Sequence, residues 1–581
     1  MSESPDRYIY AASVNDVVNQ GCLTVQIEGR VVAMFLHDGT IHAVDNRCPH
    51  MGFPLDKGSI KDGILTCHWH HARFDLESGG TFDQWADDVQ CFPVEIRDGG
   101  VWLDISSRVD AEMHQRQRLL VGLERDIPLV IGKSVLVLAD YDQNLASPFR
   151  TGLEFGTAFR WSGWGQGLTI LTCLMNMLPF LEKNDRPRAL YHGLSSVSLD
   201  TNGSAPRFGI APLPDMGAGI QTLKRWFRRF IEVRDAEGAE RCVVSAIAAG
   251  ADHRQMADML FAAAADHRYI QVGHVLDFTN KAFEALDIAG WELAGPVLTS
   301  LVRSYSEANR MEESNAWRNP IDLIEILDEG FARLPDAIRK QQSAQGSADW
   351  ENRHELVGII LDDNPALTVE AMLAALGDGA SMLDLASAVS YAAALRIARF
   401  HTSNEFSDWD TALHTFTFAN AVEQGLRRAP SIELLRGVFD AAMSVYLDRF
   451  LNIPSARIPE AGSAGDGSIP MLQSMRTLLD RQQQVNQAAE QVATYLYQGG
   501  STEHVMKVLG HLLLREDRDF HTIQAVEAAF RQAYLLQGTE DAIHGLVAAA
   551  RYLAAHSPTV RAQGQTYDIA YRLHRGDRLH V

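Results

Sequence analysis

Hydrophobic and polar positions follow two different patterns along this chain of 581 residues. Up to about Ser107, short apolar runs alternate with polar positions, as in LTVQIEG, VVAMFLHDG and VQCFPVEIRDG. Asp-Gly, Glu-Gly and Gly-Gly pairs separate these runs, and such pairs are typical of tight turns between strands. The pattern therefore predicts an all-β domain over residues 1–107.

From about Arg108 onward, apolar residues recur three and four positions apart in Ala-rich windows. Two examples are RCVVSAIAAGADHRQMADMLFAAAADHRY and LDLASAVSYAAALRIARF. This spacing and composition predict packed α-helices. We therefore expect a multidomain protein: residues 108–164 form a connector, and residues 165–581 form a large all-α domain.

Charge and composition exclude several classes of protein. The chain has 52 Lys and Arg against 74 Asp and Glu, a net charge of −22, which repels nucleic acid and anionic lipid. The longest apolar stretch, Gly167 to Leu181, is too short to span a membrane. The start, MSESPDRYIY, lacks the order of a signal peptide, and six cysteines are too few for a disulfide framework. We expect a cytoplasmic protein that binds neither nucleic acid nor membranes.

Two cysteine and histidine pairs stand in the β region. Cys48-x-His50 is followed by sixteen residues and then by Cys67-x-x-His70. Two thiolates can hold one iron of a [2Fe–2S] cluster while two neutral imidazoles hold the other. Zinc also accepts two cysteines and two histidines, but its sites usually contain a CxxC or HxxxH pair. The mixed pairs favour the iron–sulfur cluster.

This stretch, with Pro49 in its first pair and Trp69 in its second, resembles the Rieske family over about the first 107 residues. Respiratory members of that family carry an extra, disulfide-linked cysteine in each loop, and Phe53 and Trp69 occupy those positions here. The resemblance therefore implies a ferredoxin-type or oxygenase-type Rieske domain. It also implies a ferredoxin or a flavin reductase as electron donor, and an acceptor for each electron.

A mononuclear non-haem iron in the helical part is one possible acceptor. Ring-hydroxylating Rieske oxygenases hold such an iron by two closely spaced histidines and a carboxylate. Beyond residue 110, no two histidines of this sequence are three to five positions apart. The Ala-rich helices also differ from the mixed α/β catalytic domain of those enzymes, so that class is a poor match.

Histidines scattered over several predicted helices are the alternative ligands. His267, Gln271 and His274 are spaced to share one face of a helix, and Asp277 can reach the same side. Asp517 or Asp519 is placed to cap the helix that carries His521, another candidate. Together the candidate metal ligands are His192, His267, His274, His401, His414 and His521.

The helical part also resembles the questin oxidase-like family of all-helical iron oxygenases, which act on polycyclic aromatic polyketides. The matching positions are few: His267, Gly273, Asp277 and Phe278 in one helix, and Asp410, His414 and Thr417 in another. Gln271 stands where that family has a second histidine. The resemblance implies His192, His267 and His414 as iron ligands, with His274 or His401 in place of the missing one.

We expect an oxidoreductase in which the Rieske centre feeds electrons to a non-haem iron that uses O₂ to oxidise an aromatic or polyketide-like substrate. No catalytic residue beyond the metal ligands is identified. The alternative is a Rieske-type ferredoxin fused to a helical interaction domain, which passes its electrons to a separate oxygenase. A dinuclear carboxylate site is a weaker option, since the helical part contains no pair of Glu-x-x-His motifs.

Overall fold

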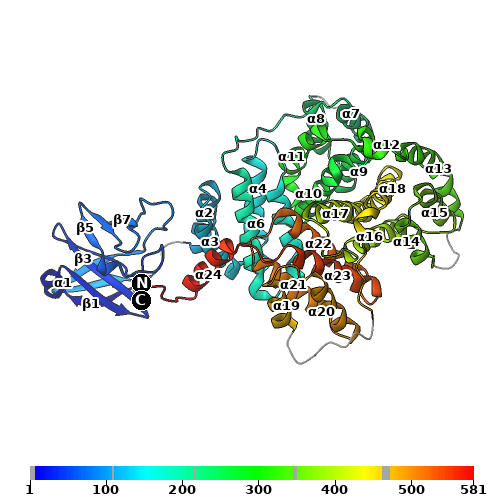
Figure 1. Ribbon diagram of the computed structural model, residues 1–581. Coiled ribbons are helices and arrows are strands. Elements are labelled where there is room, and N and C mark those ends of the chain that lie inside the picture. The colour runs from blue at the N-terminus through cyan, green and yellow to red at the C-terminus, as the bar shows by residue number, and fades with distance from the viewer. Residues whose placement is uncertain (1–6, 107–109, 215–216, 345–349, 461–470, 581) are drawn as a thin grey trace. The chain divides into compact units, whose positions relative to one another are not determined.

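The structure is a computed structural model that describes residues 7–106, 110–214, 217–344, 350–460 and 471–580 (Figure 1). The chain forms two compact units, one of Met1–Pro148 with Gln565–Val581 and one of Phe149–Gly564, called the helical unit below. Strands β1–β10 precede helices α2–α24, which confirms a β domain followed by a large helical region. The predicted boundary at Ser107 lies outside the described residues.

The β domain contains three antiparallel sheets and one short helix, α1 (Val14–Gln20). The strands pair in the order β1 (Tyr8–Ser13), β10 (Gly100–Asp104), β9 (Val94–Arg97); β2 (Cys22–Ile27), β3 (Arg30–His37), β4 (Thr40–Asp45), β8 (Cys91–Phe92); and β5 (Ser59–Lys61), β6 (Ile64–Thr66), β7 (Arg73–Asp75).

Two-residue turns connect consecutive strands at the predicted Glu-Gly and Asp-Gly pairs. In the turn between β3 and β4, Asp38 has φ 47° and Gly39 has φ 76°. Asp62 and Gly63, between β5 and β6, have φ 52° and 76°. Turns with both residues in the left-handed region match the twist of the flanking strands, which explains why the sequence pattern located them.

The core of the β domain includes both motif cysteines. Cys48 and Cys67 are 2% and 1% exposed, and they lie in one buried cluster with Val44, Leu65 and Phe74. The two cysteines are therefore held inside the domain, between the end of β4 and the β5–β6–β7 sheet.

Two helices and a C-terminal segment complete the first unit. Helices α2 (Ala111–Glu124) and α3 (Pro128–Tyr141) pack as an antiparallel hairpin. Helix α24 (Ala562–His574) contributes its residues from Gln565 onward, and Arg47 donates a 3.0 Å hydrogen bond to the carbonyl of Leu573. The predicted connector, residues 108–164, contains α2 and α3 of this unit and all of α4 (Ala146–Ala158), which crosses the division after Pro148.

The helical unit consists of helices joined mostly by short turns, with longer connections before α7 and before α19. Its α-helices are α4 (Ala146–Ala158), α5 (Gln166–Met177), α6 (Arg186–Thr201), α7 (Ile220–Glu232), α8 (Ala236–Ala248), α9 (His253–Ala265), α10 (His274–Ala289), α11 (Ala294–Glu307), α12 (Asn315–Arg318), α13 (Leu323–Ala344), α14 (Arg353–Leu361), α15 (Pro365–Gly377), α16 (Met382–Ala398), α17 (Phe406–Arg428), α18 (Ile432–Leu447), α19 (Met471–Leu479), α20 (Val485–Tyr497), α21 (Thr502–Leu514), α22 (Phe520–Leu535) and α23 (Glu540–Ala555).

Four helices near the middle of this unit position its candidate site. Helix α10 packs against α5 and α17, and α22 packs against the same two helices. Helices α10 and α22 therefore face each other across the middle of the four, as partners do in a helix bundle. Among the described residues, no helix combines the length and the apolar character that crossing a bilayer requires.

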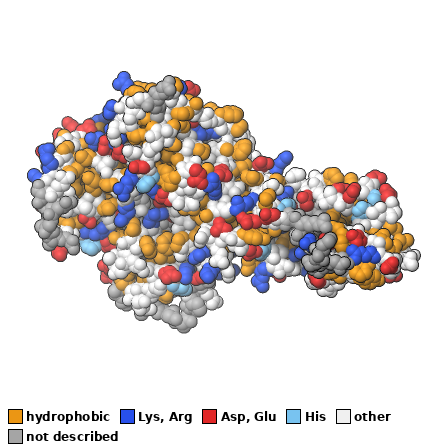
Figure 2. All heavy atoms as spheres, turned by 180° about the vertical axis from the view of Figure 1, so that it is seen from behind, with side chains coloured by type: hydrophobic (Ala, Val, Ile, Leu, Met, Phe, Trp, Pro, Cys, Tyr) orange, Lys and Arg blue, Asp and Glu red, His pale blue; other side chains and the backbone are white. Residues whose placement is uncertain are grey.

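Charged side chains of both signs lie interspersed with apolar ones over the face shown in Figure 2. Several exposed pairs lie one helical turn apart, including Arg303 with Glu307 at 2.8 Å and Arg318 with Asp322 at 3.2 Å. Exposed pairs of this kind contribute little, because solvent screens them and ordering the side chains costs entropy. The fold therefore depends mainly on the packed apolar faces of its helices and sheets.

Candidate metal centres

Cys48 and Cys67 begin two loops with the same backbone pattern. In each loop the cysteine N–H donates to the carbonyl five residues later at 2.8 Å. The cysteine carbonyl accepts from the N–H four residues later, Gly52 in the first loop and His71 in the second, at 2.8 and 3.0 Å. Gly52 and His71 both have positive φ, 79° and 63°. His71 thus closes a turn, and its neighbour His70 is the motif residue.

The four motif side chains gather at one end of the β domain. The thiols of Cys48 and Cys67 are hydrogen-bonded to each other in the core. The rings of His50 and His70 have centroids 5.0 Å apart with nearly perpendicular planes, and His70 is exposed. Two sulfur donors therefore lie inside the domain and two nitrogen donors lie at its surface.

Two of these side chains, His50 and Cys67, have pKa values shifted toward the forms that bind metal. Burial, the Lys133 ammonium and the His70 ring lower the pKa of His50 to about 4, so this imidazole is neutral. The hydrogen bond from Cys48 lowers the pKa of Cys67 to about 6, and the same bond, together with burial, raises the pKa of Cys48. Neutral imidazoles and thiolates are the forms that bind iron, so the donor set fits a [2Fe–2S] cluster with mixed ligands.

Residues 7–93 match the family described as the Rieske [2Fe-2S] domain. The N-terminal part of this chain is a Rieske domain. Such a domain implies a [2Fe–2S] cluster, as the sequence motif predicts.

Known relatives match this chain over very different shares of their own length. Human apoptosis-inducing factor 3 is 27% identical over 205 residues, which are 34% of this chain and 30% of that protein. The ferredoxin component of the naphthalene 1,2-dioxygenase system of Pseudomonas putida is 28% identical over 101 residues, 17% of this chain and 97% of that protein. The structure of the Sphingomonas yanoikuyae B1 ferredoxin is 24% identical, with a TM-score of 0.16, covering 17% of this chain and 99% of that one.

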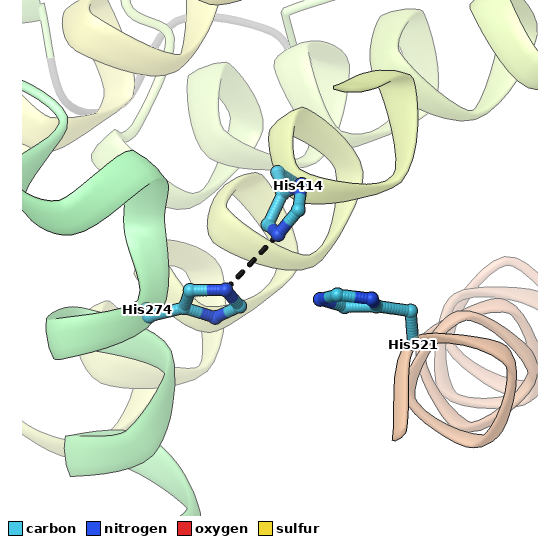
Figure 3. A group of neighbouring side chains, drawn as sticks. All are labelled: His274, His414 and His521. Carbon is cyan, nitrogen blue, oxygen red and sulfur yellow. Dashed lines mark hydrogen bonds between the residues drawn. The ribbon is translucent and has the colours of Figure 1, made fainter. Parts of the chain in front are cut away.

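A second group of ligand-type side chains lies in the helical unit, far from the Rieske motif in sequence. His274, His414 and His521 each offer a nitrogen, and these three nitrogens all lie within 4.8 Å of one another. The rings turn toward a common centre from three separate helices, α10, α17 and α22 (Figure 3). The Nε2 atoms of His274 and His414 are 3.0 Å apart. The structure thus brings together three of the six predicted histidines.

Asp410 orients two of these imidazoles. His414 Nδ1 donates to the carbonyl oxygen of Asp410, one helical turn earlier, at 2.7 Å. His521 Nδ1 lies 2.9 Å from the Asp410 carboxylate, while its Nε2 is buried without a hydrogen-bond partner among the described residues. The bond to Nδ1 of His414 directs the Nε2 lone pair of that residue toward the group, as outer partners do in metal sites. Sequence analysis gave Asp410 only as a motif position and assigned it no role in the site. Its position four residues before His414 is the signal for the contact between them.

His274 is the first residue of α10, and an unusual turn precedes it. Tyr269, Gln271 and Val272 have φ between 41° and 50°, and Gly273 has φ 91°. The left-handed region is rare for a β-branched residue such as valine. A pair of hydrogen bonds with Asn309 secures the turn: Gln271 N donates to the Asn309 carbonyl at 2.7 Å, and Asn309 N donates to Gln271 Oε1 at 2.8 Å.

This turn corrects the prediction that His267, Gln271 and His274 share one helix face. The helix begins only at His274, because residues in the left-handed region cannot continue a right-handed α-helix. His267 instead lies before the turn, where its Nδ1 is 2.8 Å from Glu312 Oε1.

Two other predicted ligands also have partners of their own. His192, in the middle of α6, is 5% exposed, and its Nδ1 lies 2.9 Å from Gln563 Oε1. His401 lies in the turn before α17, where Nδ1 is 3.0 Å from Ser403 Oγ. Neither belongs to the group of three histidines, so the structure separates His192, His267 and His401 from His274, His414 and His521.

The surroundings of the three histidines keep His274 and His414 neutral and provide an apolar wall. Burial, together with the rings of His414 and His521, lowers the pKa of His274 to about 3, and burial also lowers the pKa of His414. Phe278 and Phe520 have ring centroids 5.2 and 5.6 Å from that of His274. The side chains of His414 and His521 remain 12% and 22% exposed.

A ladder of polar contacts joins α10 to α22 below the histidines. Its four rungs run in the same direction along both helices: His274 with His521, ring centroids 5.7 Å apart; Asp277 with Gln524; Lys281 with Glu527 at 2.7 Å; and Glu284 with Arg531 at 3.3 Å. Each rung fixes the register of one helix against the other. Burial raises the pKa of Asp277 to about 8, so this rung is partly protonated near neutral pH.

Proposed function

We propose that this chain is an oxygenase in which the Rieske domain delivers electrons to an iron held by His274, His414 and His521. The observation that carries the proposal is the convergence of three imidazoles from three helices, two of them in contact with Asp410. Cys48, His50, Cys67 and His70 are the proposed ligands of the [2Fe–2S] cluster. The Rieske domain carries one electron at a time, and its fusion to the helical unit favours a redox-active metal there as the acceptor.

Three protein ligands leave coordination positions open, and an iron bound there supplies a site for O₂. The residues of the chain supply the rest of the arrangement. Asp410 holds Nδ1 of His414 and lies beside Nδ1 of His521, so both side chains present Nε2. Phe278 and Phe520 form an apolar wall beside His274, which suits a flat organic substrate. We therefore propose an aromatic or polyketide-like substrate.

The Rieske relatives support electron transfer within an oxygenase system. Relatives that match over nearly their full length are ferredoxin components of such systems, including that of naphthalene 1,2-dioxygenase from Pseudomonas putida. We propose that a ferredoxin or a flavin reductase reduces the Rieske domain of this chain.

A carrier function is the second candidate, because the same relatives are carriers that act with a separate oxygenase. In that case the helical unit binds a partner protein and holds no iron. A three-histidine site also suits zinc, which cannot take part in electron transfer. The nature and number of bound metals therefore separate the candidates.

The deciding experiment measures iron, zinc and acid-labile sulfide in the full chain, purified without oxygen and supplied with Fe(II). One [2Fe–2S] cluster contributes two irons and two sulfides. We expect a third iron per chain, which the His414→Ala variant loses while keeping both sulfides. Nitric oxide, used as a probe for open positions on Fe(II), then gives an EPR signal in the parent protein and none in His414→Ala.

His401→Ala is the matched control. It removes a histidine from the loop that leads into the same helix, α17, at a side chain outside the group of three. We expect this variant to keep the third iron. Two irons with two sulfides in the parent protein would instead establish the carrier, and zinc as the third metal would rule out the oxygenase.

A further inference from the structure

Helix α3 reaches the first Rieske loop with one side chain. Lys133 donates from Nζ to the carbonyl oxygen of Pro49 at 2.8 Å and also to that of His50. Pro49 and His50 directly follow Cys48, so the ammonium group lies against the backbone of the loop that carries two proposed cluster ligands. Lys133 itself lies outside residues 7–93, the part of the chain that matches the Rieske family.

The hairpin of α2 and α3 also contacts the segment around Trp85, which packs against His50. Arg118, on α2, donates to the carbonyls of Gln84 and Ala86 at 2.9 and 2.7 Å. The residue between them, Trp85, places its ring 4.6 Å from that of His50. The contacts of Arg118 anchor the hairpin to the β domain without Lys133. They therefore keep the helix that carries Lys133 beside the first Rieske loop.

The charge of Lys133 is not cancelled by a carboxylate of its own. Both of its acceptors are neutral carbonyl oxygens. The carboxylate that acts on it, Asp87, is engaged by Arg118 at 3.3 Å and by His114 at 2.9 Å. Arg47, next to Cys48 in the sequence, adds a further positive charge. The cationic groups around this loop are therefore not neutralised by Asp87 alone.

We propose that Lys133 raises the reduction potential of the Rieske cluster. Reduction adds one negative charge to the cluster, and a fixed cation in a partly buried position stabilises that added charge. Lys133 is thus a positioning and tuning residue that acts through the loop of Cys48 and His50. By this contact, a segment outside the Rieske domain sets how readily the domain accepts an electron. The proposal is independent of any metal in the helical unit.

The test is a redox titration of the full chain, followed by the EPR signal of the reduced cluster. We expect Lys133→Met to lower the equilibrium constant for reduction about tenfold, which is 59 mV for a one-electron couple. Lys133→Arg keeps the charge, so we expect its equilibrium constant for reduction to stay within about threefold of the parent value. Lys57→Met is the matched control, because it removes an exposed lysine on the segment between the two ligand loops.

A second variant guards against loss of the cluster in Lys133→Met. Lys133→Gln keeps a hydrogen-bond donor for the two carbonyls and removes only the charge, and we expect the same fall in potential. Iron and sulfide contents are measured on each variant. An unchanged potential in Lys133→Gln or Lys133→Met with a full cluster overturns the proposal, as does an equal fall in Lys57→Met.

Discussion

The two candidate metal centres of this chain are built in opposite ways. The proposed Rieske ligands lie between Cys48 and His70, on two loops that close with the same backbone hydrogen bonds. The three histidines extend from His274 to His521 and come from three helices whose packing alone brings them together. A site of the first kind depends on local turns, whereas a site of the second kind depends on the register of helices far apart in sequence.

The largest expected effect is loss of the Rieske cluster in Cys48→Ser. Serine offers a poor ligand for the cluster iron, and the thiol of Cys67 loses its partner. We expect both sulfides and the reduced-cluster EPR signal to disappear, while the metal content of the helical unit stays as in the parent protein. Sulfide analysis and EPR on the purified chain check this outcome.

Cys91→Ser provides the matched control, because Cys91 is a free, half-buried cysteine of the same domain. It should keep a complete cluster. If Cys48→Ser also empties the histidine site, the two centres are not built independently and the comparison between them fails.

The same contrast explains what the sequence could predict. Spacing and residue type located the Rieske motif, because Cys48 and Cys67 stand two and three positions before their histidines within one short stretch of sequence. In the helical part the periodicity identified helices, but it ran across the left-handed turn before His274 and placed His267 on the wrong element. A valine with positive φ gives no sequence signal, since tertiary contacts with Asn309 stabilise it.

The register of α10 against α22 is expected to depend on the buried Lys281. Lys281→Met leaves Glu284 and Glu527 with Arg531 alone, an uncompensated negative charge inside the four helices. Breaking a buried ion pair in this way costs about 3–5 kcal/mol. We expect that loss in the free energy of unfolding of the helical unit, measured by urea titration, with an unchanged Rieske EPR signal.

The double variant Lys281→Met with Glu527→Met serves as the control for this prediction. It removes one charge of each sign and leaves Glu284 paired with Arg531. We expect it to recover most of the lost stability, because apolar side chains of similar volume replace a buried pair at little cost. A single variant as stable as the parent protein would show that the ladder does not fix the register.

Acid should weaken the helical unit through His192. Burial lowers its pKa in the folded chain to about 4, below the ordinary value near 6.5. Between these values the unfolded chain binds a proton that the folded chain does not, so stability falls as the pH drops from about 6.5 to about 4. The whole shift corresponds to about 3 kcal/mol.

His192→Asn keeps a polar side chain beside Gln563 and cannot titrate in this range. We expect a flatter dependence of the unfolding free energy on pH between about 4 and 6.5. His504→Asn, at an exposed histidine of α21, should retain the slope of the parent protein. Equal slopes in the parent and His192→Asn would mean that His192 does not carry this acid sensitivity.

The smallest expected effect concerns Asp410, the residue that links two of the three histidines. Asp410→Ala removes the carboxylate beside His521 Nδ1 and leaves the backbone carbonyl that holds His414. Loss of an outer partner typically weakens metal binding 10- to 100-fold, so we expect a fall in Fe(II) affinity of that size.

Asp408→Ala separates this effect from a general loss of charge or helix stability. Asp408 carries the same charge two residues earlier and caps the start of α17, where it accepts from Glu405 N at 2.9 Å. We expect it to destabilise the helix slightly and leave Fe(II) affinity unchanged, as measured by titration of the metal-free site. Equal affinities in Asp410→Ala and the parent protein would mean that helix packing alone orients the histidines.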